Sequence, residues 1–277
     1  MSTPRVHGDD QTTVNLLWTG GWDSTYRLLQ LLLRHRVRVA PYYLEDPTRP
    51  STQIEISTMA RIADALHQRF PHTRGLLQPV RRAAVSDIEV DRDIADALRD
   101  IRRRMFIGSQ YAWLPAFCRR ESLDGMELGV HVDDKVQAVL RQCTMEFDHP
   151  AGFRSIRVDL ARAGAAEQLL FGRFTFPLFQ VDKRDIERDA LASGWGELME
   201  MTWFCHKPVR GRPCGFCPPC VYTIEEGLAR RVPWPRRVLS FFYRRLVLPW
   251  KEPMRQLRYG LRGHRDERPP PEPDLGA

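Results

Sequence analysis

The sequence places a glycine turn between an apolar segment and an amphipathic one. Residues 19–25 read Thr-Gly-Gly-Trp-Asp-Ser-Thr and follow the apolar run 14–18, which predicts a buried strand. Successive glycines allow a tight turn whose backbone N–H groups point inward, and the N-terminus of a helix attracts anions. Because three hydroxyl side chains add further donors, the turn is a candidate phosphate-binding site. A tight turn capped by Asp23 or Ser24 is the alternative that these residues leave open.

Four cysteines form a second pattern, closer to the C-terminus. Cys205, Cys214, Cys217 and Cys220 have the spacing C-x8-C-x2-C-x2-C. A C-x2-C step lets two thiolates reach one ion, and four thiolates complete a tetrahedral zinc site. Since such a site has no open coordination position, we expect structural and not catalytic Zn²⁺. Free or disulfide-linked thiols, and His206 as a ligand in place of Cys205, are the alternatives.

The basic charge of the 277-residue chain is concentrated near its C-terminus. The chain carries 42 Lys and Arg against 35 Asp and Glu, a net charge of +7. Residues 231–277 hold 11 basic and 5 acidic side chains, which leaves a net charge of only +1 for residues 1–230. The charge therefore bears on a partner of the C-terminal segment and says little about the rest of the chain.

Hydropathy and cysteine usage narrow the class of protein. No run approaches the roughly 18 apolar residues of a transmembrane helix, and residues 1–13 contain no apolar signal-peptide core. Six cysteines without a secretory signal argue against a disulfide scaffold and lead us to expect a cytoplasmic location. Outside the four-cysteine cluster, Cys118 lies in an apolar stretch and is expected in the core, whereas Cys143 is left unassigned.

Strand and helix patterns alternate along most of the chain. This alternation predicts an α/β fold, a parallel sheet with helices on both faces. The predicted strands are 14–18, 37–44, 76–80 and 124–132, with a short apolar segment at 174–178. The predicted helices are 23–34, 52–70, 87–104, 108–119, 163–170 and 182–194.

We expect five regions along the chain. They are a disordered N-terminus (1–12), an α/β nucleotide-binding domain (13–200), a zinc-binding segment packed on it (201–230), a basic amphipathic extension (231–263) and a disordered tail (264–277).

The extension contains an amphipathic helical pattern. Five apolar residues can share one helical face: Val238, Leu239, Phe242, Tyr243 and Leu246. Four arginines lie mostly away from that face: Arg236, Arg237, Arg244 and Arg245. Two interpretations stay open. The helix packs on the catalytic domain with its arginines in solvent, or it binds a protein, RNA or membrane-surface partner. Homodimer formation is a further expectation that the sequence does not decide.

Residues 19–24 resemble the SGGxDS loop of the N-type ATP pyrophosphatases, or PP-loop enzymes, with threonine in place of the first serine. Those enzymes cleave ATP between its α and β phosphates to adenylate a substrate. The G-x-x-x-x-G-K-[ST] and G-x-G-x-x-G phosphate motifs are both missing here. The resemblance implies that the nucleotide is bound by Thr19, Gly20, Gly21, Trp22, Asp23, Ser24 and Thr25.

Taken in order, the glycine turn and the cysteine cluster resemble the 7-cyano-7-deazaguanine synthases over roughly residues 13–230. That family ends its zinc site with CGxCxxC, and residues 214–220 read CGFCPPC. Residues 176–178, Phe-Pro-Leu, followed by Asp182 and Lys183 are similar to a strand end and lysine of that family. Residues 108–110, Gly-Ser-Gln, stand where the family has Gly-Arg-Asn, so two residues are replaced.

The resemblance implies an ATP-dependent carbon–nitrogen ligase of queuosine biosynthesis. ATP would activate the carboxylate of 7-carboxy-7-deazaguanine as an acyl adenylate, and ammonia would displace AMP to give the amide. A second ATP would then activate the amide on the way to the nitrile, preQ0. The implied cofactors are ATP, Mg²⁺ and structural Zn²⁺, and the implied catalytic residues are Asp23, Ser24 and Lys183. A solvated lysine at a helix start is the alternative for Lys183.

Two further sites are expected at the carboxyl ends of the strands, where parallel sheets bind ligands. Adenine is expected near Trp18 and residues 42–44. Residues 131–135, His-Val-Asp-Asp-Lys, stand where the family has its substrate-facing loop, but they do not match its usual sequence. Asp133 or Asp134 can pair with a guanine-like edge, and a charged surface turn is the slightly preferred interpretation.

The mismatch keeps related functions open. One is a diverged homologue that stops at the amide, or that uses a deazaguanine in a defence system or to modify a nucleic acid or protein. Another is a tRNA-thiolating PP-loop enzyme, although those usually carry catalytic cysteines near the nucleotide. A non-enzymatic alternative is a zinc-knuckle module that binds nucleic acid, against which the intact glycine turn argues.

Overall fold

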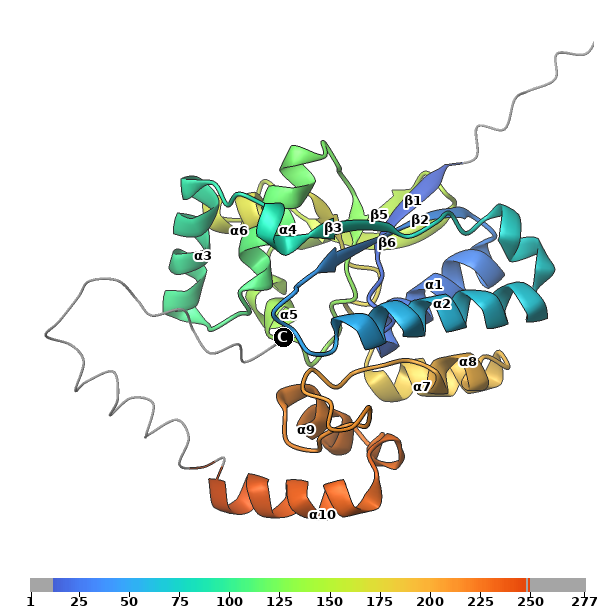
Figure 1. The fold of residues 1–277 in the computed structure, drawn as a ribbon. Helices are drawn as coiled ribbons and strands as arrows, with labels where there is room; N and C mark the ends of the chain where they lie inside the picture. The colour runs from blue at the N-terminus through green and yellow to red at the C-terminus, as the bar shows by residue number, and fades with distance from the viewer. Residues whose placement is uncertain (1–11, 248, 250–277) are drawn as a thin grey trace, which may run out of the picture.

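The computed structural model describes residues 12–247 and 249, and Figure 1 shows their arrangement. A seven-stranded sheet has the order β3-β2-β1-β4-β7-β6-β5. The strands are β1 Thr13–Leu17, β2 Arg38–Glu45, β3 Arg81–Ala84, β4 Met126–Glu127, β5 Thr144–His149, β6 Phe153–Val158 and β7 Phe174–Thr175. The predicted disordered termini fall on residues 1–11 and 264–277, which lie outside the described residues.

The α-helices are α1 Trp22–Leu29, α2 Thr52–Arg69, α3 Arg92–Arg104, α4 Gln110–Arg120, α5 Lys135–Leu140, α6 Ala165–Phe171, α7 Lys183–Ala192, α8 Gly196–Glu200, α9 Pro218–Glu225 and α10 Trp234–Phe242. Two π-helical segments continue α1 and α10, namely η1 Gln30–His35 and η5 Tyr243–Val247. The 3-10 turns are η2 Pro71–Gly75, η3 Val85–Asp87 and η4 Ala229–Arg231. Of the described helices, none combines the length and apolar character needed to cross a membrane.

Two apolar cores cover the two faces of the sheet (Figure 1). One contains side chains of α3, α4, α5 and α6, including the buried Leu98, Phe117 and Phe171. The other contains side chains of α1, α2, α7 and α8, including Leu28 and Ile62. The predicted α/β class, with helices on both faces of the sheet, is therefore confirmed.

The sheet is mixed and not wholly parallel. β3, β2, β1, β4 and β7 run parallel to one another, whereas β6 is antiparallel to both β5 and β7. The β5–β6 hairpin was not predicted because β5 has no fully buried residue, so its sequence lacks a clear two-residue apolar period. A tight turn at Gly152, whose φ is +84°, joins the two strands.

Two predicted strands also differ in their bounds. The strand expected at 124–132 is reduced to Met126–Glu127, because residues 128–134 leave the sheet and line a cleft. The strand expected at 76–80 is replaced by β3 at Arg81–Ala84, and only a single bridge from Val39 to Leu77 lies in the earlier segment.

A buried ion pair fixes α1 against the centre of the sheet. Arg27 Nε and Nη2 donate to the two carboxylate oxygens of Glu127, each at 2.7 Å. Their side chains are only 5% and 0% exposed, and the Arg27 guanidinium also lies 4.5 Å from the ring centroid of Phe153. The pair therefore fixes the position of α1, the helix that follows the glycine turn, relative to β4.

We expect Glu127→Gln to lower the free energy of unfolding by about 3 kcal/mol, because it leaves the buried Arg27 charge without its counter-ion. Urea denaturation measures the change. The matched control is Glu45→Gln, which breaks the more exposed pair with Arg82 and should cost less than about 1 kcal/mol. Equal unfolding free energies for the wild type and Glu127→Gln would contradict the prediction.

Candidate functional site

The glycine turn connects β1 to α1 through a backbone conformation that requires glycine. Gly20 has a φ of +70°, and a Cβ atom there would lie 3.1 Å from Met59 Cγ. α1 then begins at Trp22 without any side-chain cap, so the expected capping by Asp23 or Ser24 is not observed. The first amides of the helix therefore have neither an intrahelical acceptor nor a cap.

The hydroxyl groups of the turn face one another instead of capping the helix. Ser24 Oγ accepts a hydrogen bond from the backbone N–H of Thr19 at 3.3 Å and lies 3.3 Å from Thr19 Oγ1. Thr19 Oγ1 also accepts from the N–H of Gly21 at 3.3 Å. Thr25 is fully buried, and its hydroxyl accepts from the indole N–H of Trp18. Thr19 and Ser24 are thus placed for a ligand, whereas Thr25 supports the turn from behind.

A cleft of about 640 Å³ opens at this turn, at the carboxyl ends of β1 and β4. Its walls come from six parts of the chain: the turn with Leu17, Arg49 with Glu55, residues 106–114, residues 128–136, Lys183, and the region from 203 to 231. The backbone just after β4 approaches the turn so closely that a Cβ atom on Gly129 would lie 3.2 Å from Asp23 Cβ. The cleft is therefore built where an α/β sheet is expected to bind its ligand.

Lys183 points into the cleft from the first turn of α7. Its Nζ lies 2.8 Å from Glu226 Oε2 and 4.0 Å from Asp23 Oδ2, and its side chain is 17% exposed. Burial lowers the pKa of Lys183, but the nearby carboxylates of Asp23, Glu226 and Asp134 outweigh it and raise the pKa above its ordinary value. Lys183 is thus a charged residue of the cleft wall and not a solvated lysine.

Arg231 is a cleft residue that the sequence did not reveal. Its side chain is 4% exposed, and the guanidinium carbon lies 4.8 Å from the ring centroid of Trp22 and 4.9 Å from that of Phe204. Nη2 donates to the carbonyl oxygen and hydroxyl of Thr202 at 2.5 and 2.6 Å. Burial lowers the pKa of Arg231 to about 10, so it remains a cation near neutral pH. The boundary expected after residue 230 cuts through the 3-10 turn that holds this side chain.

Residues 131–135 include a turn with exposed side chains, as expected, and four of them also line the cleft: His131, Asp133, Asp134 and Lys135. Asp134 caps α5 by accepting a hydrogen bond from the N–H of Val136 at 2.8 Å. Burial raises the pKa of Asp134, and the charge of Asp23 raises it further against the opposing effect of His131. His131 is buried, and its Nδ1 accepts from the N–H of Asp133. The only sign in the sequence that these residues belong to the site was their position, directly after a predicted strand of an α/β fold.

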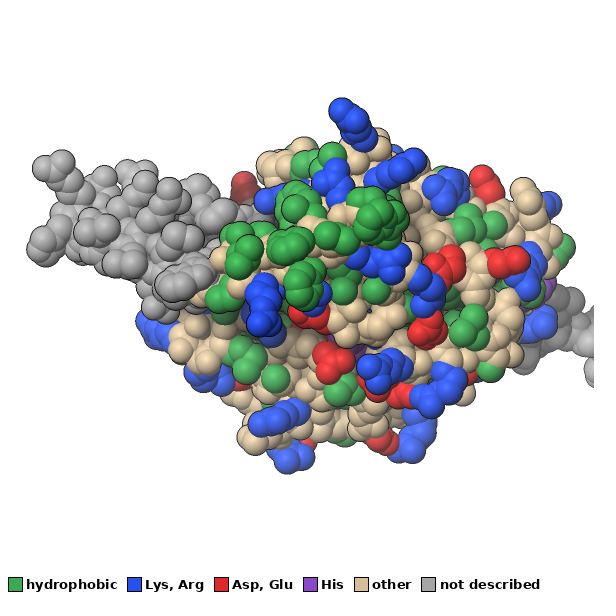
Figure 2. Space-filling view, turned by 90° about the horizontal axis from the view of Figure 1, so that it is seen from below, with side chains coloured by type: hydrophobic (Ala, Val, Ile, Leu, Met, Phe, Trp, Pro, Cys, Tyr) green, Lys and Arg blue, Asp and Glu red, His purple; other side chains and the backbone are tan. Residues whose placement is uncertain are grey.

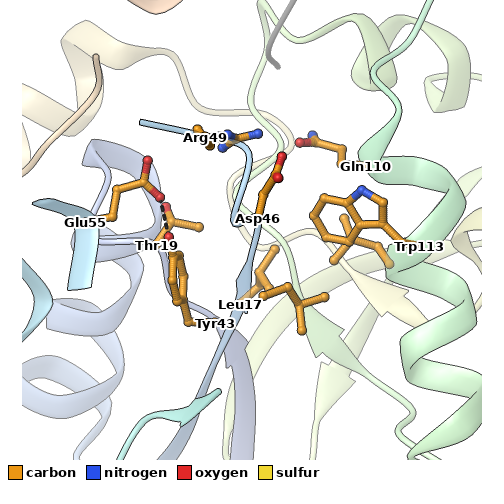
Figure 3. Close-up of a pocket in the computed structure, with 10 residues that line it drawn as sticks. Leu17, Thr19, Tyr43, Asp46, Arg49, Glu55, Gln110 and Trp113 are labelled. Atoms are coloured by element: carbon orange, nitrogen blue, oxygen red, sulfur yellow. Dashed lines mark hydrogen bonds between the residues drawn. The ribbon is translucent and has the colours of Figure 1, made fainter. Parts of the chain in front are cut away.

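A small cavity of about 60 Å³ adjoins the cleft beyond Thr19 (Figure 3). Tyr43 and Leu44, at the end of β2, line it, and Arg49 lines both cavities. Trp18 lines neither cavity, because its side chain is fully buried in the core of the α1 side. Its neighbour Leu17 lines both.

Two polar groups stand at the mouth of this small cavity. Figure 3 shows Asp46 and Gln110 facing each other across it, beside the ring of Trp113. Tyr43 donates its hydroxyl hydrogen to Glu55 at 2.7 Å, and Glu55 also accepts from Ser51 at 2.6 Å. These bonds fix the wall of the cavity next to the glycine turn. Gln110, one of the two replacements in the segment 108–110, thus lies at the site.

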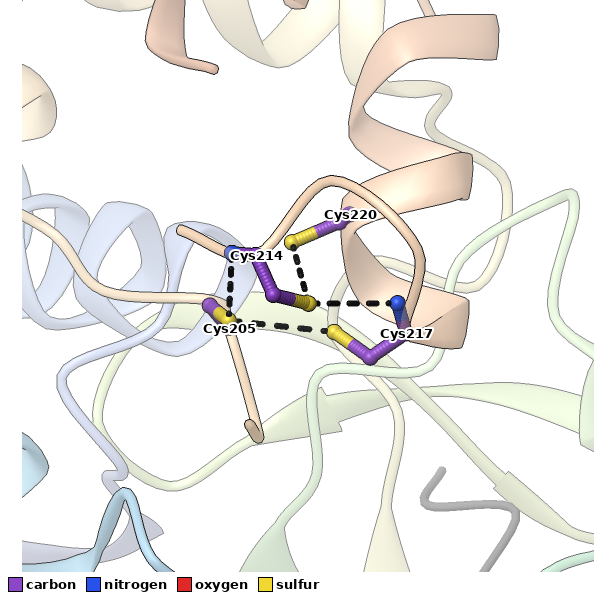
Figure 4. Close-up of side chains that lie close together, drawn as sticks. All are labelled: Cys205, Cys214, Cys217 and Cys220. Atoms are coloured by element: carbon purple, nitrogen blue, oxygen red, sulfur yellow. Dashed lines mark hydrogen bonds between the residues drawn. The ribbon is translucent and has the colours of Figure 1, made fainter. Parts of the chain in front are cut away.

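The four cysteines converge on one point (Figure 4). All four are buried, and their Sγ atoms lie within 4.8 Å of one another. Two Sγ pairs, Cys205 with Cys217 and Cys214 with Cys220, are each 3.8 Å apart, and no disulfide joins them. Four thiolates about 2.3 Å from one tetrahedral ion would lie about 3.8 Å apart. The cluster therefore fits a single metal ion.

The backbone around the cluster supports thiolate ligands. The N–H groups of Phe216 and Cys217 donate to Cys214 Sγ, and the N–H of Cys214 donates to Cys205 Sγ. His206 is not part of the cluster. It lines the cleft, and burial lowers its pKa to about 3. The alternative ligand set with His206 and the disulfide alternative are therefore both wrong.

The remaining cysteines are structural. Cys118 is fully buried, as expected, and burial raises the pKa of its thiol to about 12. Cys143 is buried as well and donates to the carbonyl oxygen of Leu140. Within residues 12–247, no cysteine lines the cleft. A cysteine-based reaction at the glycine turn therefore has no thiol in the described part of the chain.

A direct hydrogen bond links the cysteine segment to the glycine turn. The N–H of Trp203 donates to the carbonyl oxygen of Gly20 at 2.9 Å, and its indole N–H donates to the carbonyl oxygen of Cys205 at 2.7 Å. Trp203 and Phe204 also form part of the cleft wall. Metal binding by the cysteines would therefore fix one wall of the cleft and, through Trp203, the turn itself.

We expect Gly20→Ala to weaken ATP binding by on the order of tenfold, because the left-handed backbone costs an alanine about 1 kcal/mol and the new Cβ presses on Met59. Isothermal titration measures the affinity. Gly152→Ala is the matched control. It has the same left-handed backbone, with no atom within 4 Å of the new Cβ, in the distant hairpin. It should lower stability and leave ATP affinity unchanged. Equal effects on ATP affinity would contradict the assignment of the turn.

Comparisons with known proteins do not show a family for this chain. No family model matches the chain, and no curated protein matches it. Among solved structures, the chain is similar to the U34-tRNA thiolase NcsA from Methanococcus maripaludis, solved with its four-iron, four-sulfur cluster. The match covers 85% of this chain and 72% of that chain, with a TM-score of 0.42 and 14% identity. A similarity this distant does not establish a shared reaction, substrate or cluster.

Proposed function

We propose that the protein is an ATP-dependent enzyme that adenylates a carboxylate in its cleft. One observation carries the proposal. The uncapped glycine turn, with the hydroxyls of Thr19 and Ser24, opens into a cleft that also holds two largely buried cations, Lys183 and Arg231. Uncapped amides and buried cations bind the phosphates of a nucleotide and stabilise the charge that develops during their transfer. The resemblance to the PP-loop signature agrees with this proposal.

In the proposed reaction, a substrate carboxylate oxygen attacks the α phosphorus of ATP. The bond from that phosphorus to the bridging oxygen of the β phosphate breaks, and pyrophosphate leaves with the electron pair. The amides at the start of α1 and the hydroxyls of Thr19 and Ser24 hold the phosphates. Lys183 offsets the charge of the departing pyrophosphate, since its raised pKa keeps it protonated.

Mg²⁺ would be held by the carboxylates next to the turn. Asp23 Oδ1 is buried and, within the described residues, has no hydrogen-bond partner. Asp134 is close enough that the two carboxylates influence each other's charge. Oxygen ligands of this kind suit Mg²⁺, which would neutralise phosphate charge. The four thiolates instead suit Zn²⁺, which would serve a structural role.

For the substrate, we propose 7-carboxy-7-deazaguanine, with ammonia as the second substrate. Ammonia attacks the carbonyl carbon of the acyl adenylate, AMP leaves, and the amide forms. A second adenylation, on the amide oxygen, followed by loss of AMP gives the nitrile. The support is the order and spacing of the two motifs, and the carboxylate of Asp133 in the cleft, which can accept the N–H groups of a guanine-like edge.

Mass spectrometry of the products from ATP, ammonia and 7-carboxy-7-deazaguanine tests the proposal. We expect AMP and pyrophosphate together with the nitrile. The amide alone would support a diverged enzyme that stops after the first step. AMP formation with a different acid, and not with the deazaguanine, would support adenylation as the reaction and exclude the deazaguanine as the substrate. If no AMP forms with any deazaguanine and the protein instead binds tRNA or DNA tightly, the nucleic-acid-binding alternative is correct.

A further inference from the structure

The helix α10 packs on the protein through its polar side and turns its apolar side outward. Four positions of α10 and η5 at helical spacing face the cysteine segment: 236, 240, 243 and 244. Ser240 is fully buried, the ring of Tyr243 lies 6.2 Å from that of Phe216, and Arg244 pairs with Glu225 at 3.2 Å. The backbone of Arg236 lies so close to Gly215 that any Cβ there would meet its carbonyl oxygen at 2.5 Å.

The outward side of the same helix is apolar and exposed. Its large side chains are between 44% and 68% exposed: Trp234, Val238, Leu239, Phe241, Phe242, Leu246 and Val247. α10 is the lowest helix in Figure 1, and the view from below in Figure 2 shows a continuous hydrophobic patch with basic side chains at its edge. The interpretation that this helix buries its apolar face against the catalytic domain is therefore wrong.

Arginines border the patch. α10 and η5 contain Arg236, Arg237, Arg244 and Arg245 and no Asp or Glu, and the neighbouring Glu225 is paired with Arg244. Arg237 and Arg245 are exposed beside the apolar side chains. An apolar helix face that contains Trp, Phe and Leu, bordered by arginines, matches the boundary between headgroups and acyl chains of an anionic bilayer.

Other occupants fit the patch less well. A two-fold contact with a second copy would bring two basic surfaces together, which is unfavourable. RNA is bound through phosphates and stacked bases, so basic and aromatic side chains would be expected at the centre of the surface. Here the exposed side is continuous and apolar, it includes the aliphatic Val238, Leu239, Leu246 and Val247, and basic side chains lie at its edge.

We propose that α10 and η5 form a docking surface for an anionic lipid bilayer. The apolar side chains enter the acyl boundary, and Arg237 and Arg245 contact lipid phosphates. No described residue of α10 or η5 lines the cleft, whereas α9, next to them, contributes Tyr222 and Thr223 to its wall. Docking therefore leaves the cleft open to small substrates and anchors the enzyme without a membrane-spanning helix.

Flotation of the full-length protein with vesicles tests the proposal. We expect it to float with vesicles of phosphatidylcholine that contain phosphatidylglycerol, to bind vesicles of phosphatidylcholine alone much more weakly, and to dissociate as salt screens the charges. The double variant Leu239→Ser and Phe242→Ser should bind on the order of tenfold or more weakly, because two apolar side chains no longer leave water. The control is Leu191→Ser, which changes a leucine on α7 that is more exposed than either of them.

The double variant Arg237→Gln and Arg245→Gln should lose the preference for anionic vesicles and retain weak apolar binding. Zinc content and ATP turnover of every variant, measured without vesicles, should equal those of the wild type, because none of these side chains reaches the cleft. Unchanged values separate a lost docking surface from a misfolded protein.

Three results would overturn the proposal. The first is equal binding to neutral and anionic vesicles. The second is that the protein does not bind vesicles but sediments as a dimer, and that the double variant Leu239→Ser and Phe242→Ser is a monomer. The patch would then be a self-association surface. The third is binding of an RNA oligonucleotide that these substitutions abolish, in the absence of vesicle binding. None of the three depends on whether the cleft adenylates a deazaguanine.

Discussion

The Cys214→Ser variant is expected to lose most of its zinc and nearly all of its ATP turnover. Cys214 Sγ lies 3.8 Å from Cys220 Sγ and accepts hydrogen bonds from the N–H groups of Phe216 and Cys217. Binding of Zn²⁺ by four thiolates contributes on the order of 10 kcal/mol to the order of the segment that supplies them. Without the ion, we expect the cysteine segment to unfold locally.

The loss of activity follows from the position of this segment. Trp203 is hydrogen-bonded to the carbonyl oxygen of Gly20, and Trp203 and Phe204 form a wall of the cleft. A misplacement of reacting groups by about 1 Å can lower a rate on the order of a hundredfold. Metal analysis gives the zinc content, and AMP release gives the turnover.

The matched control is Cys143→Ser. This cysteine is also buried, but its thiol donates to the carbonyl oxygen of Leu140, and a serine hydroxyl can make the same bond. Zinc content and turnover should stay at the wild-type level. Full zinc occupancy in Cys214→Ser would contradict the metal site, and lost zinc with full turnover would contradict its coupling to the cleft.

Lys183→Gln is expected to lower kcat on the order of a hundredfold to a thousandfold, which is the usual effect of removing one group that stabilises transition-state charge. The Lys183 ammonium lies 4.0 Å from a carboxylate oxygen of Asp23 in the glycine turn. Its exchange for a neutral amide should leave ATP binding less affected than turnover. Initial rates of AMP release, together with the ATP affinity from titration, separate the two effects.

Arg184→Gln provides the control for charge removal, because it changes the adjacent and exposed position of the same helix. It should leave kcat unchanged. The pKa of Lys183 is raised, so the ammonium stays charged through the neutral range and is lost only above its ordinary pKa of 10.5. A wild-type rate that falls between neutral pH and 9 through loss of this charge would contradict the assignment, as would an unchanged kcat in Lys183→Gln.

Local sequence signals were sufficient for the parts of the site that lie within one short segment. The glycine turn is recognisable because φ values such as that of Gly20 require glycine, and the C-x2-C spacing brings thiolates together by itself. The buried strands and helices of the α/β fold were likewise predictable, because burial on a regular element imposes a periodic pattern. The β5–β6 hairpin was not, since β5 buries no residue fully and leaves no such pattern.

The sequence by itself thus determined the fold class, the turn and the cysteine cluster, each of which depends on neighbours along the chain. Only the tertiary structure decided that Lys183 meets Asp23 and Glu226, that Arg231 lies between Trp22 and Phe204, and that Trp18 belongs to the core. It also decided which side of α10 faces solvent. An amphipathic pattern shows that a helix has two different sides, but which side is buried depends on the surface it meets. Here Gly215, Phe216 and Glu225 contact its polar side, and the apolar side stays exposed.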